Sequence, residues 1–201
     1  MGLAEIAAAR GNLDEALRAY EEELQDHPGS FEVIGGYGVI LGLAGRNAEA
    51  RLHLLHALDA YPGIAELHLS LSIIEAELGN PRESLRYVRE ALRLSPKNVE
   101  AANNLAWLLA TSHDSSLREP NEAIRLIERI ALESQDPGLL DTLAAAYAAA
   151  GRFDAAVTTA SRAASGAEAL GYEADASAFR ARLSLYRRGE PYIEEHTDDT
   201  N

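Results

Sequence analysis

The amino-acid sequence predicts an all-α protein, an α-solenoid of about five helix–turn–helix units closed by a C-terminal capping helix. Three sets of residues carry this prediction, because the members of each set recur every 34 positions. The first set is glycine, the second is proline and the third is a small residue: Gly11, Gly45, Gly79; Pro28, Pro62, Pro96; Ala16, Ala50, Ser84.

Each recurring residue type suits one place in a helical repeat. The glycines follow apolar helical stretches and fit the left-handed residue that ends a helix. The small residues allow a neighbouring helix to approach closely, and the prolines end the second helix of a unit. The period lengthens once, between Ser84 and Ala123, and the polar stretch Ser112–Glu119 accounts for the surplus. We therefore expect a longer loop inside the fourth unit.

Apolar spacing and capping residues define the helices in chain order. The expected helices span 2–10, 14–26, 31–44, 48–60, 65–78, 82–94, 99–111, 121–133, 138–150, 154–168 and 173–187. The clearest starts are Asn80 before Pro81 and Asp136 before Pro137, since a cap residue followed by proline opens a helix. The last helix has a single apolar face, which suits a cap over the end of the array.

The third and fifth units carry a further pattern. The residues concerned are Leu71, Ser72, Gly79, Ser84, Val88, Ala91 and Pro96, and Leu143, Ala144, Tyr147, Gly151, Phe153, Ala156, Ala160 and Ala163. With them the chain resembles the tetratricopeptide repeat over about residues 3–165. The resemblance implies a right-handed superhelix with units near 1–30, 31–64, 65–98, 99–136 and 137–171, a capping helix at 172–188 and an acidic tail at 189–201.

The two ends of the sequence do not fit a complete repeat unit. The first unit has only Gly2–Arg10 before its turn, so we expect either a short cap or the C-terminal piece of a longer array. The stretches 103–111, 140–157 and 185–192 also resemble the C-terminal end of large bacterial repeat proteins. Residues 189–201 contain five acids and no lysine or arginine, which predicts a solvated tail rather than an acidic docking tail.

Charge excludes several classes of partner. The chain has 32 acidic and 18 basic residues, a net charge of −14, and no cysteine. Nucleic acids and anionic membrane surfaces are therefore not expected as partners. No apolar run reaches membrane-spanning length and no secretory leader is evident. We expect a cytoplasmic location if the chain is complete, whereas a fragment leaves the location open.

The family resemblance implies that the first helix of each unit lines a concave face. The side chains expected there, which form the candidate partner-binding set, are Glu32, Val39, Leu43, Glu66, Leu69, Ile73, Glu100, Asn103 and Trp107. This set has acids around an apolar strip and no lysine or arginine. It favours a peptide or helix of another protein that combines aliphatic with basic residues.

Two features of this face have alternative interpretations. Trp107 is either a binding anchor or a structural residue packed beneath the 112–119 loop or against the fifth unit. Gly35, Gly38 and Gly42 weaken their helix, which is understandable if a neighbouring helix or a bound partner packs closely against them. A phosphate-binding loop is disfavoured, because the glycines do not fit a nucleotide motif.

Catalytic and metal sites are not expected, and neither is a cofactor. His53, His56 and His68 are the only candidates for a zinc site, and no carboxylate is spaced to complete it. No nucleophile motif surrounds a serine or threonine. The sequence thus predicts a non-catalytic protein-interaction module, an adaptor or scaffold. The alternative is a structural role, in which the incomplete first unit packs on a second copy or on further repeats.

Overall fold

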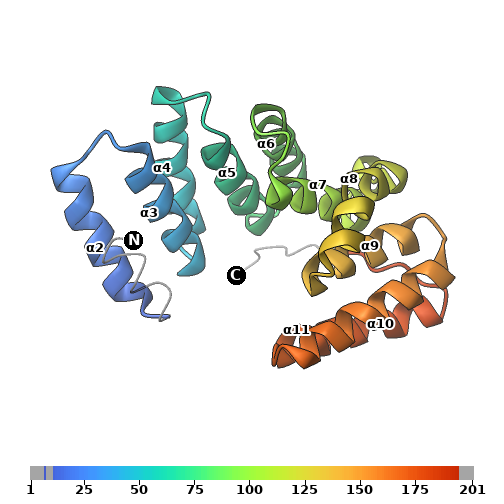
Figure 1. The fold of residues 1–201 in the computed structure, drawn as a ribbon. Helices are drawn as coiled ribbons and strands as arrows, with labels where there is room; N and C mark the ends of the chain where they lie inside the picture. The colour runs from blue at the N-terminus through green and yellow to red at the C-terminus, as the bar shows by residue number, and fades with distance from the viewer. Residues whose placement is uncertain (1–6, 8–10, 195–201) are drawn as a thin grey trace. The chain divides into compact units, whose positions relative to one another are not determined.

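The computed structural model describes residue 7 and residues 11–194, and every regular element in that part of the chain is a helix (Figure 1). The chain divides into two compact units, Met1–Pro96 and Lys97–Asn201. Within each unit, successive helices pack on one another, so the protein is an all-α solenoid of helical repeats. None of the described helices is long and apolar enough to span a membrane.

The first unit is built from five helices. They are α2 (Leu13–Asp26), α3 (Phe31–Leu43), α4 (Asn47–Ala60), α5 (Ala65–Glu77) and α6 (Pro81–Leu94). The turns after α3 and α5 use Gly45 and Gly79, whose φ angles of 74° and 72° suit residues without a Cβ. Besides pairing with its neighbours in sequence, α3 also packs against α5.

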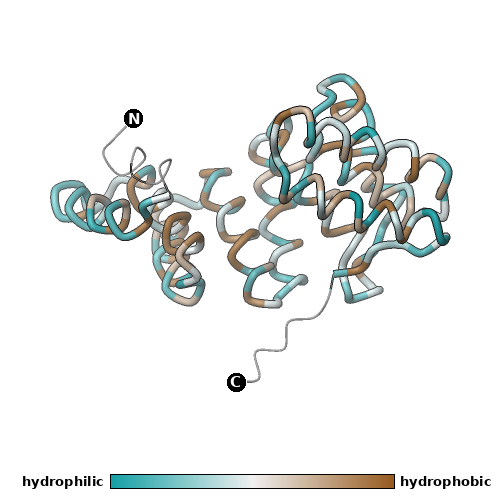
Figure 2. The backbone as a smooth tube through the Cα atoms, turned by 90° about the horizontal axis from the view of Figure 1, so that it is seen from below, coloured by the Kyte–Doolittle hydropathy of each residue, from teal (hydrophilic) through white to brown (hydrophobic). Residues whose placement is uncertain are grey.

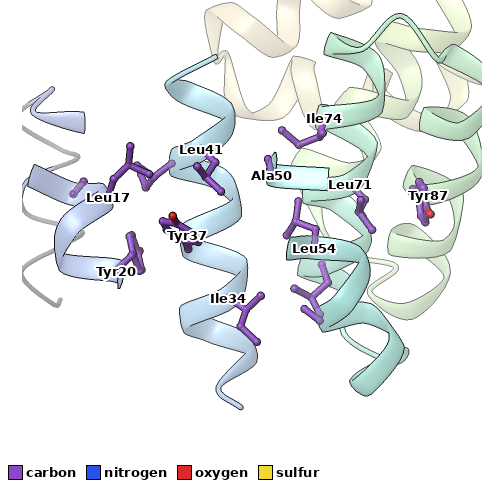
Figure 3. Close-up of a cluster of buried hydrophobic side chains, with 14 of the residues drawn as sticks. Leu17, Tyr20, Ile34, Tyr37, Leu41, Ala50, Leu54, Leu71, Ile74 and Tyr87 are labelled. Atoms are coloured by element: carbon purple, nitrogen blue, oxygen red, sulfur yellow. The ribbon is translucent and has the colours of Figure 1, made fainter. Parts of the chain in front are cut away.

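The core of the first unit lies between these helices (Figure 3). It contains Leu17 and Tyr20 of α2, Tyr37 of α3 and Leu54 of α4, all of which are buried. Side chains of this size fill the space between successive helices at the density of a protein interior. The amphipathic period in the sequence therefore becomes one continuous apolar layer.

The glycines of α3 permit close helix packing on two sides. A Cβ at Gly38 would lie 2.7 Å from Cγ of Leu54 on α4, and a Cβ at Gly42 would lie 2.6 Å from Cδ1 of Ile74 on α5. These separations are far below normal carbon–carbon contact distances of about 3.5–4.0 Å. The interpretation that neighbouring helices pack against these glycines is confirmed.

The second unit begins with α7 (Val99–Thr111). The chain continues through the 3₁₀ helix η1 (Ser115–Leu117), α8 (Pro120–Ser134), α9 (Pro137–Ala149), α10 (Phe153–Ala169) and α11 (Glu173–Arg187). The expected long loop lies between α7 and α8 and contains η1. The loop is held by the buried side chain of Leu117 and by a hydrogen bond from the Glu119 amide to the Leu109 carbonyl (2.9 Å).

Alanine dominates the core of the second unit. Along α9 every residue from Leu140 to Ala148 is buried, and Ala144 and Ala146 are fully inaccessible. Small side chains on α9 and α10 let the two helices approach closely, and α11 packs on α10 as the sequence predicts for the final helix. Hydrophobic and hydrophilic residues alternate along the helices of both units (Figure 2).

The helix bounds expected from the sequence agree with the structure to within one residue at each end from α2 to α11. Of the expected helix at 2–10, only Ala7 lies among the described residues. One capping prediction is confirmed, because the Asp136 carboxylate accepts the Leu139 amide (3.0 Å). The Asn80 side chain does not cap α6 but donates to Glu75 (2.9 Å), since that buried carboxylate needs a donor.

Candidate functional site

The predicted partner-binding residues recur with the repeat. Val39, Ile73 and Trp107 are 34 positions apart and occupy the same place in α3, α5 and α7. The first two lie in the first unit and Trp107 lies in the second, so each unit is described by itself.

On the first unit the exposed apolar residues come from α3 and α5. Val39, Leu43 and Ile73 are 42%, 65% and 39% exposed, so three large aliphatic side chains reach the surface on two helices that pack together. The two helices are held side by side by the close approach of Ile74 to Gly42. We call Val39, Leu43 and Ile73 the apolar strip.

Acidic side chains flank the apolar strip. Glu32 and Glu66 are exposed in the first turns of α3 and α5, and neither helix contains a lysine or arginine. Glu32 accepts a hydrogen bond from the Ser30 hydroxyl (2.7 Å), which fixes it beside the N-cap of α3. Leu69 is only 6% exposed, so the packing of the first unit already uses this member of the predicted set.

On the second unit Trp107 is covered by the chain that follows α11. The indole Nε1 donates to Oε1 of Glu194 (2.6 Å), and the ring centroids of Trp107 and Tyr192 are 5.8 Å apart. The Glu194 amide donates to the Thr111 carbonyl at the end of α7 (2.9 Å). Figure 1 shows this segment running back from α11 to α7.

Arg182 of α11 completes the surroundings of Trp107. Its guanidinium carbon lies 5.3 Å from the ring centroids of both Trp107 and Tyr192 and 5.4 Å from that of Phe179. Its Nη2 and Nε also bind the two carboxylate oxygens of Asp141, at 2.8 and 3.1 Å. Burial raises the pKa of Asp141, and the hydrogen bonds and charge of Arg182 oppose that rise. The pair therefore holds a cation in a largely dry, aromatic site.

The contacts of Trp107 differ from both structural alternatives that the sequence suggests, the 112–119 loop and the fifth unit. The indole is partly exposed, and it contacts the C-terminal segment and Arg182. The expectation of a solvated tail is wrong for Tyr192 and Glu194, because the Tyr192 ring lies near the Trp107 ring and the Glu194 carboxylate accepts the indole N–H. Residues 195–201 lie outside the described residues. Glu100 is exposed and Asn103 is half-buried.

Two sequence models described as tetratricopeptide repeat match the chain, over residues 65–169 and residues 1–68. The first alone covers more than half of the chain. The chain belongs to the tetratricopeptide repeat (TPR) family. The TPR fold supports a general role in protein interaction or scaffolding, with proteins as partners, and TPR proteins are generally non-catalytic.

Known proteins share parts or all of this fold. The chain is 30% identical over 132 residues to Protein O-mannosyl-transferase TMTC3 of Homo sapiens and 27% identical over 116 residues to Protein CTR9 homolog of Arabidopsis thaliana. These stretches are 14% and 11% of the two relatives, so the chain spans a small part of their length. The solved TPR protein TTC0263 of Thermus thermophilus is similar with a TM-score of 0.71 and 19% identity, over 92% of this chain and 96% of that one.

Two of the three histidines that the sequence offers for a zinc site, His53 and His68, contact other residues of this TPR chain. His53 meets the Tyr37 ring edge-on, with centroids 5.0 Å apart, and His68 is buried with Nε2 2.9 Å from the Pro62 carbonyl oxygen. Within residues 11–194 no three side chains of His, Asp or Glu gather in a way that could hold a metal ion.

The sequence analysis did not identify three residues that contact Trp107, namely Arg182, Tyr192 and Glu194. Arg182 belongs to the helix that the sequence predicts as a cap, and Tyr192 and Glu194 belong to the segment that it predicts as a solvated tail. No local pattern links them to Trp107. The only signal in the sequence was the resemblance over residues 185–192, which includes Tyr192.

Proposed function

We propose that this TPR chain is a non-catalytic adaptor that binds a peptide or helix of a partner protein along the first helices of its repeats. On the first unit the binding surface is the apolar strip of Val39, Leu43 and Ile73. The observation that carries the proposal is the exposure of three large aliphatic side chains on neighbouring helices that carry acids and no basic residues.

The chemistry of the strip defines the partner. Burying exposed aliphatic surface is favourable by about 25 cal/mol per Å², so an apolar segment gains most by docking there. Glu32 and Glu66 attract lysine or arginine placed beside that segment and disfavour acidic competitors. We therefore expect a partner segment that alternates aliphatic with basic residues.

A displayed library of random peptides, selected on the immobilised protein, tests this function. Selected peptides should combine aliphatic with basic residues and should lose affinity for Ile73→Ala and for Glu66→Gln. Leu52→Ala is the matched control, because Leu52 is 69% exposed but lies on α4, a second helix. Circular dichroism confirms that each variant is folded. Equal binding to the Ile73 and Leu52 variants would contradict the proposed surface.

The structural alternative rests on residues 2–10, which the sequence predicts as a short first helix. Of these residues only Ala7 lies among the described ones. Measuring the molar mass in solution across a range of concentrations separates the two roles. A monomer that retains the selected peptides supports the adaptor, and an oligomer that loses them supports assembly.

A further inference from the structure

The last carbonyl of α7 accepts a hydrogen bond from a part of the chain that is distant in sequence. The last four carbonyls of a helix lack partners within the helix. At the end of α3 the glycine turn bonds two of them, since the Gly45 amide donates to the Gly42 carbonyl (2.9 Å) and the Arg46 amide to the Leu41 carbonyl (2.8 Å). The loop after α7 replaces that turn.

The loop satisfies only some of the carbonyls of α7. Ser112 donates to Leu108 (3.1 Å) and Glu119 donates to Leu109 (2.9 Å). The carbonyl of Thr111, a fully buried residue, is bonded instead by the amide of Glu194, which is far away in sequence. A backbone N–H from an extended segment thus completes the end of the helix, and this bond does not depend on the side chain that accompanies it.

Side chains add selectivity to this backbone contact. The Trp107 indole N–H binds the Glu194 carboxylate, and Tyr192, two positions earlier, lies against the Trp107 ring and the Arg182 guanidinium. Residues i and i+2 of an extended chain lie on the same side, so one segment presents both groups together. Arg182 is oriented independently of the segment, because Asp141 binds it through two hydrogen bonds.

We propose that Trp107, Arg182 and the Thr111 carbonyl form a binding site for an extended segment of a partner protein, with an aromatic residue followed two positions later by a carboxylate. Residues 190–194 are the intramolecular ligand of this site, and a partner segment of the same pattern binds by displacing them. We call the site the Trp107 site. Its ligand chemistry differs from that of the apolar strip, and the inference stands independently of the function proposed there.

The intramolecular ligand sets a threshold for the partner. Only four residues separate the end of α11 at Arg187 from Tyr192, so the effective local concentration of the segment is in the millimolar range. A peptide that binds the vacated site with a Kd of about 0.1 mM would bind the intact protein about tenfold more weakly. Weak ligands therefore do not displace residues 190–194, whereas a partner that makes further contacts with the protein does.

The chain has one tryptophan, so its fluorescence reports directly on this site. The vacated protein is the chain ended at Gly189, because a variant that changes side chains alone keeps the amide that bonds Thr111. The control is Glu190→Ala in the full chain, which removes one carboxylate that pairs with Arg188 instead. The probe is a synthetic peptide with the sequence of residues 188–194, RGEPYIE, which has no tryptophan. Peptides with the tyrosine or the final glutamate replaced by alanine are the ligand controls.

We expect Trp107 emission to shift to longer wavelength in the vacated protein, because water replaces the segment, and to stay unchanged in the Glu190→Ala protein. Titration with RGEPYIE should reverse the shift, the two alanine peptides should bind at least about tenfold more weakly, and the intact protein should respond least. An unchanged emission in the vacated protein would show that residues 190–194 do not cover Trp107 and would overturn the proposal. A folded vacated protein that ignores RGEPYIE, or an intact protein that binds it equally well, would overturn the site.

Discussion

The substitution Gly38→Ala sets two opposing effects against each other within one helix. Alanine in a helix interior is favoured over glycine by about 1 kcal/mol, so the change would stabilise an isolated α3. In the folded protein the added Cβ would lie 2.7 Å from Cγ and 2.8 Å from Cδ2 of Leu54. Leu54 is fully buried, and the nearer atom is its branch point, which cannot rotate away.

The packing effect should exceed the propensity effect. Adding a methyl group to a filled core costs about 1–3 kcal/mol. The expected net loss for Gly38→Ala is therefore about 1–2 kcal/mol, once the propensity gain of about 1 kcal/mol is subtracted from the upper part of that range. Gly35→Ala is the matched control, because its Cβ would meet only the end of Leu67, at 3.3 Å. We expect Gly35→Ala to be neutral or to stabilise by up to about 1 kcal/mol.

Urea unfolding followed by circular dichroism, together with hydrogen exchange of α3 peptides, measures this difference. Repeat arrays lose strict two-state behaviour, so the local exchange rate is the more direct readout. Faster exchange in α3 for Gly38→Ala than for Gly35→Ala is the expected result. If Gly38→Ala is as stable as Gly35→Ala, α3 and α4 are not packed as tightly as the structure shows, and the reasoning is refuted.

Three further substitutions address other contacts. Arg51→Ala leaves the carboxylate of Glu75, which is 1% exposed, without its cation, and should cost about 2–3 kcal/mol in urea unfolding, partly recovered by adding Glu75→Gln. Burial and a carboxylate on α8 raise the pKa of Tyr147 to about 12, whereas an unfolded tyrosine titrates near 10. The neutral form is therefore favoured by folding, so stability is complete below about pH 10 and falls towards pH 12, and Tyr147→Phe should flatten that fall in pH-dependent unfolding. Gly151→Ala forces a side chain to φ 74° with nothing within 4 Å of its Cβ, and should lower stability by about 1–2 kcal/mol, whereas Gly63→Ala, which has no such φ and also meets nothing, should change it little.

Local signals in the sequence define the helices. The glycines at the turns and the apolar spacing between them act over one or two helical turns, and each helix from α2 to α11 begins and ends within one residue of its expected bounds. The packing of α3 was predictable in kind, because consecutive interior glycines are understandable only if something packs closely on them. Which atoms of Leu54 and Ile74 would limit that packing required the structure.

The surroundings of Trp107 were not predictable in the same way. The indole is 87 positions from Glu194, and the acidic residues around Glu194 match a solvated tail as well as they match a bound segment. The contact of Asn80 was also not predictable from local sequence, although its partner is only five positions away. Its position predicted a cap, but the side chain donates to buried Glu75, and the burial of that carboxylate follows from tertiary packing alone.

The bond between Glu194 and Thr111 also has a consequence for the order of folding. Contacts between neighbouring helices form at short sequence separation, which is why repeat arrays assemble quickly and from several starting points. The contact from the C-terminal segment to α7 closes a much longer loop and costs correspondingly more chain entropy. We expect α7–α11 to form first and the segment to dock last, so refolding monitored by Trp107 fluorescence should lag behind refolding monitored by helical circular dichroism.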